Sequence, residues 1–204
     1  MYRSDDPNSV ENFRPISVLP VLSKLLENVV HSQLSDYLEK EQLLNDSQFG
    51  YRKNRSTHLA TTLLVDEIRE AGDNGMLTGA LFLDLSKAFD TINHNLILKK
   101  LMSYGVRCSE LNWFTDYLFL RSQVVGVSNQ KPSRFYLSSG VPQGSILGPL
   151  LFVIFFNDFP EQLSSKCIQY ADDTIIYHAD KNVNIIENVL NEEIKKLPNY
   201  FYEN

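Results

Sequence analysis

Apolar side chains recur at helical spacing in several parts of the chain. Within residues 22–38 they fall three or four positions apart, which predicts a helix with an apolar face. A further apolar run begins at Gly148 and Pro149, where proline suits the first turn of a helix. Together with helix end signals such as Gly105, these patterns predict helices at residues 22–38, 59–68, 95–104, 110–120, 183–197 and in a segment that starts at 148–149.

Short runs rich in β-branched and aromatic residues predict the strands. Residues 78–85 (TGALFLDL) follow a turn-forming AGDNG segment and are mostly apolar, so they predict a buried strand with Asp84 near its carboxyl end. Two pairs of runs lie close together in sequence, and each pair predicts a hairpin. One pair is 124–127 and 134–137, connected through 129–133, and the other is 166–170 and 174–178, with Ala171, Asp172 and Asp173 left to form the turn.

The composition of the 204 residues is that of a globular protein, with 43% hydrophobic and 22% charged residues. The longest apolar run falls well short of the roughly 20 residues that span a bilayer, and the N-terminal sequence is unlike a signal peptide. Cys108 and Cys167 lie far apart in sequence, and no cluster has zinc-ligand spacing. We therefore expect an intracellular protein, in the cytoplasm or the nucleus, with no membrane partner.

The charge of the chain gives two opposing indications about a nucleic-acid partner. The net charge of −6 argues against one, because phosphate-binding domains usually carry a basic surplus. A local cluster can override the total, and the segment GYRKNRST places Arg52, Lys53 and Arg55 close together. The alternative interpretation of this cluster is a solvated turn.

Two adjacent carboxylates, Asp172 and Asp173, follow one apolar strand and precede another. They repel each other in an apolar setting unless a cation or hydrogen-bond donors neutralise them. Asp84 can join them if the strand ends converge in one sheet, and hard oxygen ligands favour Mg²⁺ or Mn²⁺. Two such ions roughly 4 Å apart support nucleotidyl transfer. The alternative is ordinary turns, which tolerate aspartate well and leave Asp84 far from the doublet.

Five segments, in this order, closely resemble the reverse transcriptase domain of non-LTR (LINE-type) retrotransposons. They are NFRPISVLPVLSKLLE (12–27), FGYRKNRST (49–57), LFLDLSKAFDTINH (81–94), SSGVPQGSILGPLLF (138–152) and YADD (170–173). The resemblance implies an α+β fold, with a right-hand polymerase palm of an antiparallel sheet and packed helices at about 78–94 and 144–204. Fingers are expected at about 1–77 and 95–143. Because relatives usually extend past both ends, residues 1–204 are expected to form a single fragment with the thumb absent.

The resemblance also implies roles for individual residues. Asp84, Asp172 and Asp173, with the backbone carbonyl of Leu85, match the family's ligands for Mg²⁺, for which Mn²⁺ can substitute. Phe89 matches the bulky gate that excludes a ribose 2′-hydroxyl, although an ordinary core phenylalanine is the alternative. The other residues expected to bind the nucleotide are Gln143, which otherwise is part of a good turn, and Arg52 and Arg55, which would grip the triphosphate.

The function implied by the resemblance is RNA-directed DNA polymerisation in retrotransposition. The partners would be an RNA template, a DNA primer and deoxynucleoside triphosphates. An RNA-dependent RNA polymerase would share the metal chemistry, and Phe89 discriminates between the two. The alternative from another class is a catalytically inactive remnant that binds nucleic acid or protein.

Overall fold

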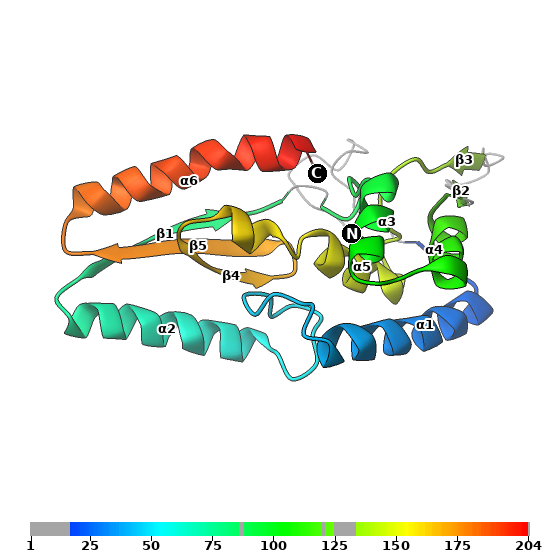
Figure 1. The fold of residues 1–204 in the computed structure, drawn as a ribbon, viewed down its shortest axis with the longest axis horizontal. Helices are drawn as coiled ribbons and strands as arrows, with labels where there is room; N and C mark the ends of the chain where they lie inside the picture. Colours follow the sequence, from blue (N-terminus) through cyan, green and yellow to red (C-terminus); the bar gives the residue numbers. More distant parts are fainter. Residues whose placement is uncertain (1–16, 86–87, 120, 125–133, 204) are drawn as a thin grey trace, which may run out of the picture.

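The computed structural model describes residues 17–85, 88–119, 121–124 and 134–203 (Figure 1). Within them the chain alternates helices with short antiparallel strands, which gives the predicted α+β class. None of the described helices is both long enough and apolar enough to cross a membrane. The elements are α1 (Val21–Lys40), α2 (Thr57–Asp73), β1 (Leu77–Leu83), α3 (His94–Ser103), α4 (Cys108–Phe119), β2 (Ser122–Val124), β3 (Arg134–Tyr136), α5 (Leu147–Phe155), the 3₁₀ turn η2 (Phe159–Gln162), β4 (Lys166–Tyr170), β5 (Asp173–Asp180) and α6 (Val183–Glu203).

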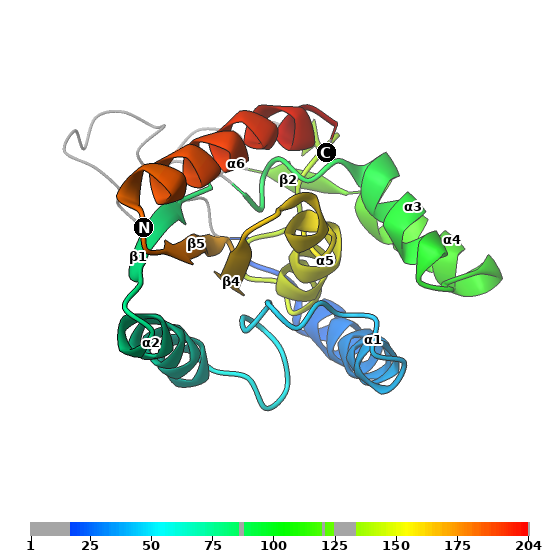
Figure 2. The same cartoon turned by 60° about the vertical axis from the view of Figure 1, so that its left-hand side comes forward.

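The central sheet has three antiparallel strands in the order β1–β5–β4. Helices α2 and α6 lie on its opposite faces (Figure 2). Side chains alternate accordingly along β5, because Ile175 packs on the α2 side and Ile176 belongs to the main core. The α6 side needs a residue without a side chain at Gly79, since a Cβ there would lie 2.4 Å from the Cγ2 atom of Ile186.

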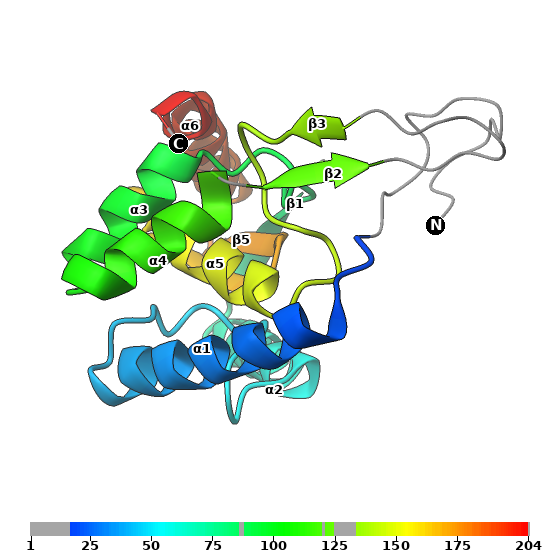
Figure 3. The ribbon, with the colours of Figure 1, turned by 90° about the vertical axis from the view of Figure 1, so that its right-hand side faces the viewer.

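The main core surrounds α5, whose residues Leu151, Val153 and Ile154 are fully buried. Helix α1 packs on one side of α5 and helix α3 on another (Figure 3). A helix that is apolar on all sides has to be buried in this way. Because α5 follows the Gly140–Gly144 loop and shares its core with Cys167 and Ile176 of the sheet, this core fixes the loop relative to the sheet.

Several boundaries differ from the sequence predictions. The strand predicted at 78–85 covers Leu77–Leu83, so Asp84 and Leu85 follow it, and its residues are exposed or half-buried where a buried strand was predicted, because β1 lies at the edge of the sheet. Asp173 pairs with Tyr170, so it starts β5 and leaves only Ala171 and Asp172 in the turn. The hairpin predicted from 124–127 and 134–137 corresponds to the pairing of β2 with β3, in which the first strand begins earlier, at Ser122. Residues 125–127 and the connection 129–133 lie outside the described part.

Helix α6 was predicted to end at 197 but continues through Pro198 to Glu203. Proline removes one helical hydrogen bond, which normally disfavours the interior of a helix. Tyr200 compensates for this loss, because it is 7% exposed, packs on Phe156 and Phe159, and donates a hydrogen bond to Asp158. Tertiary packing therefore outweighs the local signal.

Candidate active site

The sheet brings Asp84 to the same end as the acidic doublet. Leu83, the last residue of β1, pairs with Thr174 of β5, so Asp84 and Asp173 are the next residues outward on the two strands. Asp172 lies in the adjoining turn. Asp84 and Asp173 are exposed and Asp172 is half-buried. The three carboxylates thus gather at one sheet end, although they come from distant parts of the sequence.

The donor chemistry of this sheet end fits a hard divalent cation, because it offers carboxylate oxygens with little competing nitrogen or sulfur. Among the residues that the structure describes, no three His, Cys, Asp or Glu side chains are already close enough together to hold one ion. The exposed side chains of Asp84 and Asp173 can rotate about two bonds, so bringing their oxygens closer to Asp172 needs no change in the strand register. The negative charge of Asp172 is felt by Tyr51, whose pKa is raised first by burial and then by the charges of Asp172 and Tyr170.

Phe89 is held by the loop that precedes α5. Its carbonyl accepts a hydrogen bond from the Val141 amide at 2.8 Å, and the amide of Gly140 donates to the Ile92 carbonyl at 2.8 Å. The half-buried Phe89 ring lies 4.9 Å from the Phe152 ring, centroid to centroid. Gly140 has a φ of +81°, and a Cβ there would lie 2.7 Å from the Asp90 carbonyl oxygen. The loop therefore positions Phe89 on α5.

Gln143 has a partner that the sequence did not indicate. Its side-chain amide nitrogen donates to both carboxylate oxygens of Asp90, each at 3.1 Å. Both residues line a cavity of about 290 Å³ next to β2 and β3. Because the amide nitrogen is occupied, the amide oxygen of Gln143 is the atom left to face other groups. Asp90 was missed because nothing in its local sequence pattern distinguishes it from the surrounding residues.

The cations of the segment 52–55 differ in their surroundings. The Arg52 side chain is only 6% exposed and forms two parallel bonds to the Glu39 carboxylate, at 2.9 and 2.8 Å. Its remaining donor nitrogen bonds the Asn45 carbonyl at 2.7 Å. Arg55 pairs with the exposed Asp46 and lies over the Phe49 ring, 5.0 Å from its centroid. The structure thus commits Arg52 to internal contacts and leaves Arg55 as the more accessible guanidinium.

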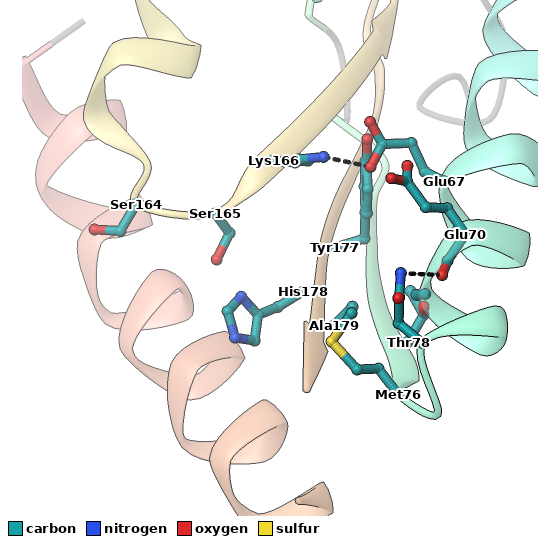
Figure 4. Close-up of a pocket in the computed structure, with 12 residues that line it drawn as sticks. Glu67, Glu70, Met76, Thr78, Ser164, Ser165, Lys166, Tyr177, His178 and Ala179 are labelled. Atoms are coloured by element: carbon teal, nitrogen blue, oxygen red, sulfur yellow. Dashed lines mark hydrogen bonds and ion pairs between the residues drawn. The ribbon is translucent and has the colours of Figure 1, made fainter. Parts of the chain in front are cut away.

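A second cavity lies at the opposite end of the sheet, near the Leu77–Asp180 pair (Figure 4). It has a volume of about 340 Å³, and none of the residues predicted from the sequence to bind substrate or metal lines it. Lys166 forms an ion pair with Glu67 there. Figure 4 shows His178 on the α6 side of β5 and Glu67 on the α2 side, so the lining side chains do not converge on one point.

The sequence is similar to a known protein family. The sequence model described as "Reverse transcriptase (RNA-dependent DNA polymerase)" matches residues 5–203. The chain is 32% identical, over 94% of its length, to the "Probable RNA-directed DNA polymerase from transposon BS" of Drosophila melanogaster, and covers 21% of that protein. It is 29% identical to the "RNA-directed DNA polymerase from mobile element jockey" of the same species, over 87% of the chain and 20% of the relative.

Among solved structures, the fold is similar to apo telomerase from Candida tropicalis, truncated from its C-terminal domain, with a TM-score of 0.61. The sequence identity is 15%, and the match covers 86% of this chain and 37% of that one. This likeness concerns the fold alone. The chain spans about a fifth of the length of the curated relatives quoted above.

Proposed function

The chain belongs to the reverse transcriptase (RNA-dependent DNA polymerase) family, with retrotransposon polymerases as relatives, and we propose from this that it forms the palm and fingers of such a polymerase. Its reaction would be transfer of deoxynucleotides onto the 3′-hydroxyl of a DNA primer, directed by an RNA template. The palm would comprise about 78–94 and 144–204, and the fingers about 1–77 and 95–143.

The observation that carries the proposal is the register of β1 with β5. The Leu83–Thr174 pair makes Asp84 and Asp173 neighbours at one sheet end, beside the turn that contains Asp172. Surface turns that hold aspartate for backbone reasons alone have no cause to meet in this way. Three exposed or half-exposed carboxylates at one point repel one another in the absence of a cation.

The residues that would hold Mg²⁺, or Mn²⁺ in its place, are Asp84, Asp172 and Asp173, with the backbone carbonyl of Leu85. When bound, two such ions supply activation of the primer hydroxyl and stabilisation of the leaving pyrophosphate in an in-line displacement. The chain itself contributes the negative charge that attracts them and the rigid sheet end from which the carboxylates project.

Other residues of the chain would select and orient the nucleotide. Phe89, held against Phe152, would exclude the ribose 2′-hydroxyl by contact with the sugar. Gln143 would touch the nucleotide through its amide oxygen, since its nitrogen is bonded to Asp90. Arg55 is the stronger candidate for the triphosphate, because Arg52 would first have to leave Glu39.

Primer extension tests the reaction. A labelled DNA primer on an RNA template is supplied with Mg²⁺ or Mn²⁺, deoxynucleotides and either the chain, Asp172→Asn or Asp66→Asn. Asp66 is an exposed carboxylate on α2, so its variant loses the same charge far from the site. We expect Asp172→Asn to abolish extension and Asp66→Asn to retain it. Binding of primer-template without extension, also by a version of the chain lengthened beyond residue 204, would favour a binding remnant instead.

Sugar selection separates the DNA polymerase from an RNA polymerase with the same metal chemistry. Phe89→Ala should increase the use of ribonucleotides relative to deoxynucleotides. The ratio of the two rates is the useful quantity, because loss of packing against Phe152 would lower both rates together. An unchanged ratio would remove Phe89 from its role as the gate.

A further inference from the structure

The turn that carries Asp172 has an unfavourable backbone. Ala171 has a φ of +58°, in the left-handed region that disfavours residues with a Cβ. A turn of two residues between antiparallel strands requires such a conformation, and glycine or asparagine usually supplies it. Alanine offers neither conformational freedom nor a side-chain hydrogen bond, so contacts from elsewhere must hold the turn in place.

One side chain, that of Gln48, supplies these contacts. Its amide oxygen accepts hydrogen bonds from the Ala171 amide at 3.0 Å and from the Gly50 amide at 2.7 Å. Its amide nitrogen donates to the Ala171 carbonyl at 3.4 Å. Gln48 is 1% exposed and Ala171 is 4% exposed, so water does not compete for these bonds. Both backbone polar groups of the left-handed residue are thus satisfied by one side chain.

The segment around Gln48 is locked against the hairpin. The Phe49 amide donates to the Gln169 carbonyl at 2.8 Å, and the Gln169 amide donates to the Ser47 carbonyl at 2.8 Å. A Cβ at Gly50 would lie 2.2 Å from the Ala171 nitrogen, so only glycine allows this approach. The segment and the turn therefore form one rigid unit.

We propose that Gln48 is a positioning residue, which acts through Ala171 to fix the turn that presents Asp172 and Asp173 to the divalent cation. The inference rests on the proposed function for its effect on the reaction, but the geometry of the turn is independent of that function. Gln48 itself is buried and would touch neither substrate nor metal. The same locked segment carries Phe49, and Arg55 lies over the Phe49 ring. Gln48 therefore also fixes Arg55, the residue proposed to bind the triphosphate, relative to the carboxylates.

Two substitutions test the role through different atoms. Gln48→Met keeps the length of the side chain and removes its hydrogen bonds, whereas Gly50→Ala pushes the segment away from the turn. Each should weaken Mn²⁺ binding by the chain alone roughly 10- to 100-fold, the usual effect of losing a group that orients metal ligands. Mn²⁺ binding is measured by electron paramagnetic resonance without nucleotide. Gln33→Met, at an exposed position, is the matched control and should bind as the unaltered chain does.

Amide hydrogen exchange reports on the turn without any metal. In Gln48→Met the Ala171 amide should exchange faster, while the amides of α5 keep their protection. Addition of Ala171→Gly to Gln48→Met should restore part of the Mn²⁺ affinity, because glycine adopts a positive φ without cost. A loss of fold would remove protection throughout the chain and would not be reversed in this way.

The outcomes distinguish the proposed metal site from the positioning role of Gln48. If Asp172→Asn binds Mn²⁺ as well as the unaltered chain does, the proposed metal site is wrong and this inference falls with it. If Asp172→Asn loses binding but Gln48→Met and Gly50→Ala retain it, the site stands and the positioning role of Gln48 is overturned. Weak binding by both variants, faster exchange at Ala171 and rescue by Ala171→Gly would support the role.

Discussion

Glu27 offers the sharpest test of how the N-terminal helix is attached to the core. It lies on α1 and is 3% exposed, yet it carries a carboxylate. One oxygen accepts hydrogen bonds from the Ile146 amide at 2.7 Å and, at 3.5 Å, from the Leu147 amide, at the start of α5. The other oxygen accepts a bond from the Tyr117 hydroxyl at 3.1 Å. One side chain thus joins α1, α4 and α5, and we expect its removal to be costly.

The magnitude follows from these bonds. Hydrogen bonds to charged groups contribute about 1.5–3 kcal/mol each, and an anion at a helix N-terminus contributes up to about 2 kcal/mol. Glu27→Ala loses these contributions and leaves buried donors without partners, so we expect a loss of about 3–4 kcal/mol in the free energy of unfolding. For a chain of this size that corresponds to a fall of roughly 6–16 °C in Tm. Glu27→Gln keeps the bonds from the two backbone amides on its amide oxygen and replaces the bond from the Tyr117 hydroxyl with one donated by its amide nitrogen to that hydroxyl, so it should lose only about 1–2 kcal/mol.

Trp113 makes the measurement straightforward. It is the only tryptophan in the chain, and it stacks on Tyr117 with the ring centroids 5.3 Å apart. Its fluorescence during urea unfolding therefore reports on the region around Glu27. Glu187→Ala, at an exposed position on α6, is the control and should stay within about 0.5 kcal/mol of the unaltered chain. If Glu27→Ala is no more destabilising than this control, the hydrogen bonds of Glu27 do not stabilise the fold as predicted here.

Three further predictions use other contacts. Arg52→Lys should lower the free energy of unfolding by about 1–2 kcal/mol in urea titrations, because an ammonium group cannot form the two parallel bonds to Glu39; unchanged stability would contradict this. Burial, followed by a nearby lysine, lowers the pKa of His31 from 6.5, so the folded state binds fewer protons than the unfolded state and stability should decrease as the pH falls below 6.5. His31→Gln should flatten this part of the stability profile, and an unaltered slope would exclude the histidine as its source. Asp90→Leu should raise KM for the deoxynucleotide about tenfold in steady-state kinetics, which is the equivalent of one hydrogen bond. Addition of Gln143→Ala should have no further effect, and additive effects would show that the two residues act separately.

The sequence predicts those features of the fold that depend on local patterns. Apolar spacing and helix end signals located the described α-helices but not the 3₁₀ turn η2, and the short runs at 166–170 and 174–178 located the hairpin whose register brings the carboxylates together. It did not predict which cation of the 52–55 segment is buried. That depends on Glu39, which lies on another element and reaches Arg52 only after α1 has packed. Neighbouring cations look equivalent in the local sequence, and only tertiary contacts determine which of them is buried.

The role of Gln48 at the site could not be predicted from the sequence either. Its segment resembles a family motif, but the residue type gives no indication that a side chain from this segment satisfies the backbone of Ala171. The need for it arises from the positive φ of Ala171, a property of the folded turn. A left-handed alanine cannot be recognised in a sequence in the way that an Asn-Gly turn can. A sequence motif can therefore propose residues that touch substrate, whereas a residue such as Gln48, which holds the backbone of the turn, becomes apparent only in the folded structure.

Buried hydrogen bonds attach the segment from α1 to Gly50 to the rest of the protein at three places. Glu27 bonds the start of α5, Asn157 accepts a hydrogen bond from the Asn45 amide and donates one to the Leu43 carbonyl, and Gln48 bonds the Ala171–Asp172 turn. All three side chains are at most 7% exposed, so breaking any of these contacts leaves buried polar groups unpaired. The segment from α1 to Gly50 therefore cannot rotate as a body against the sheet without losing several buried hydrogen bonds at once. The proposed fingers and palm therefore form one rigid body in this region. As a result, the carboxylates of the sheet end keep a fixed position relative to Phe49 and to Arg55, which lies over its ring.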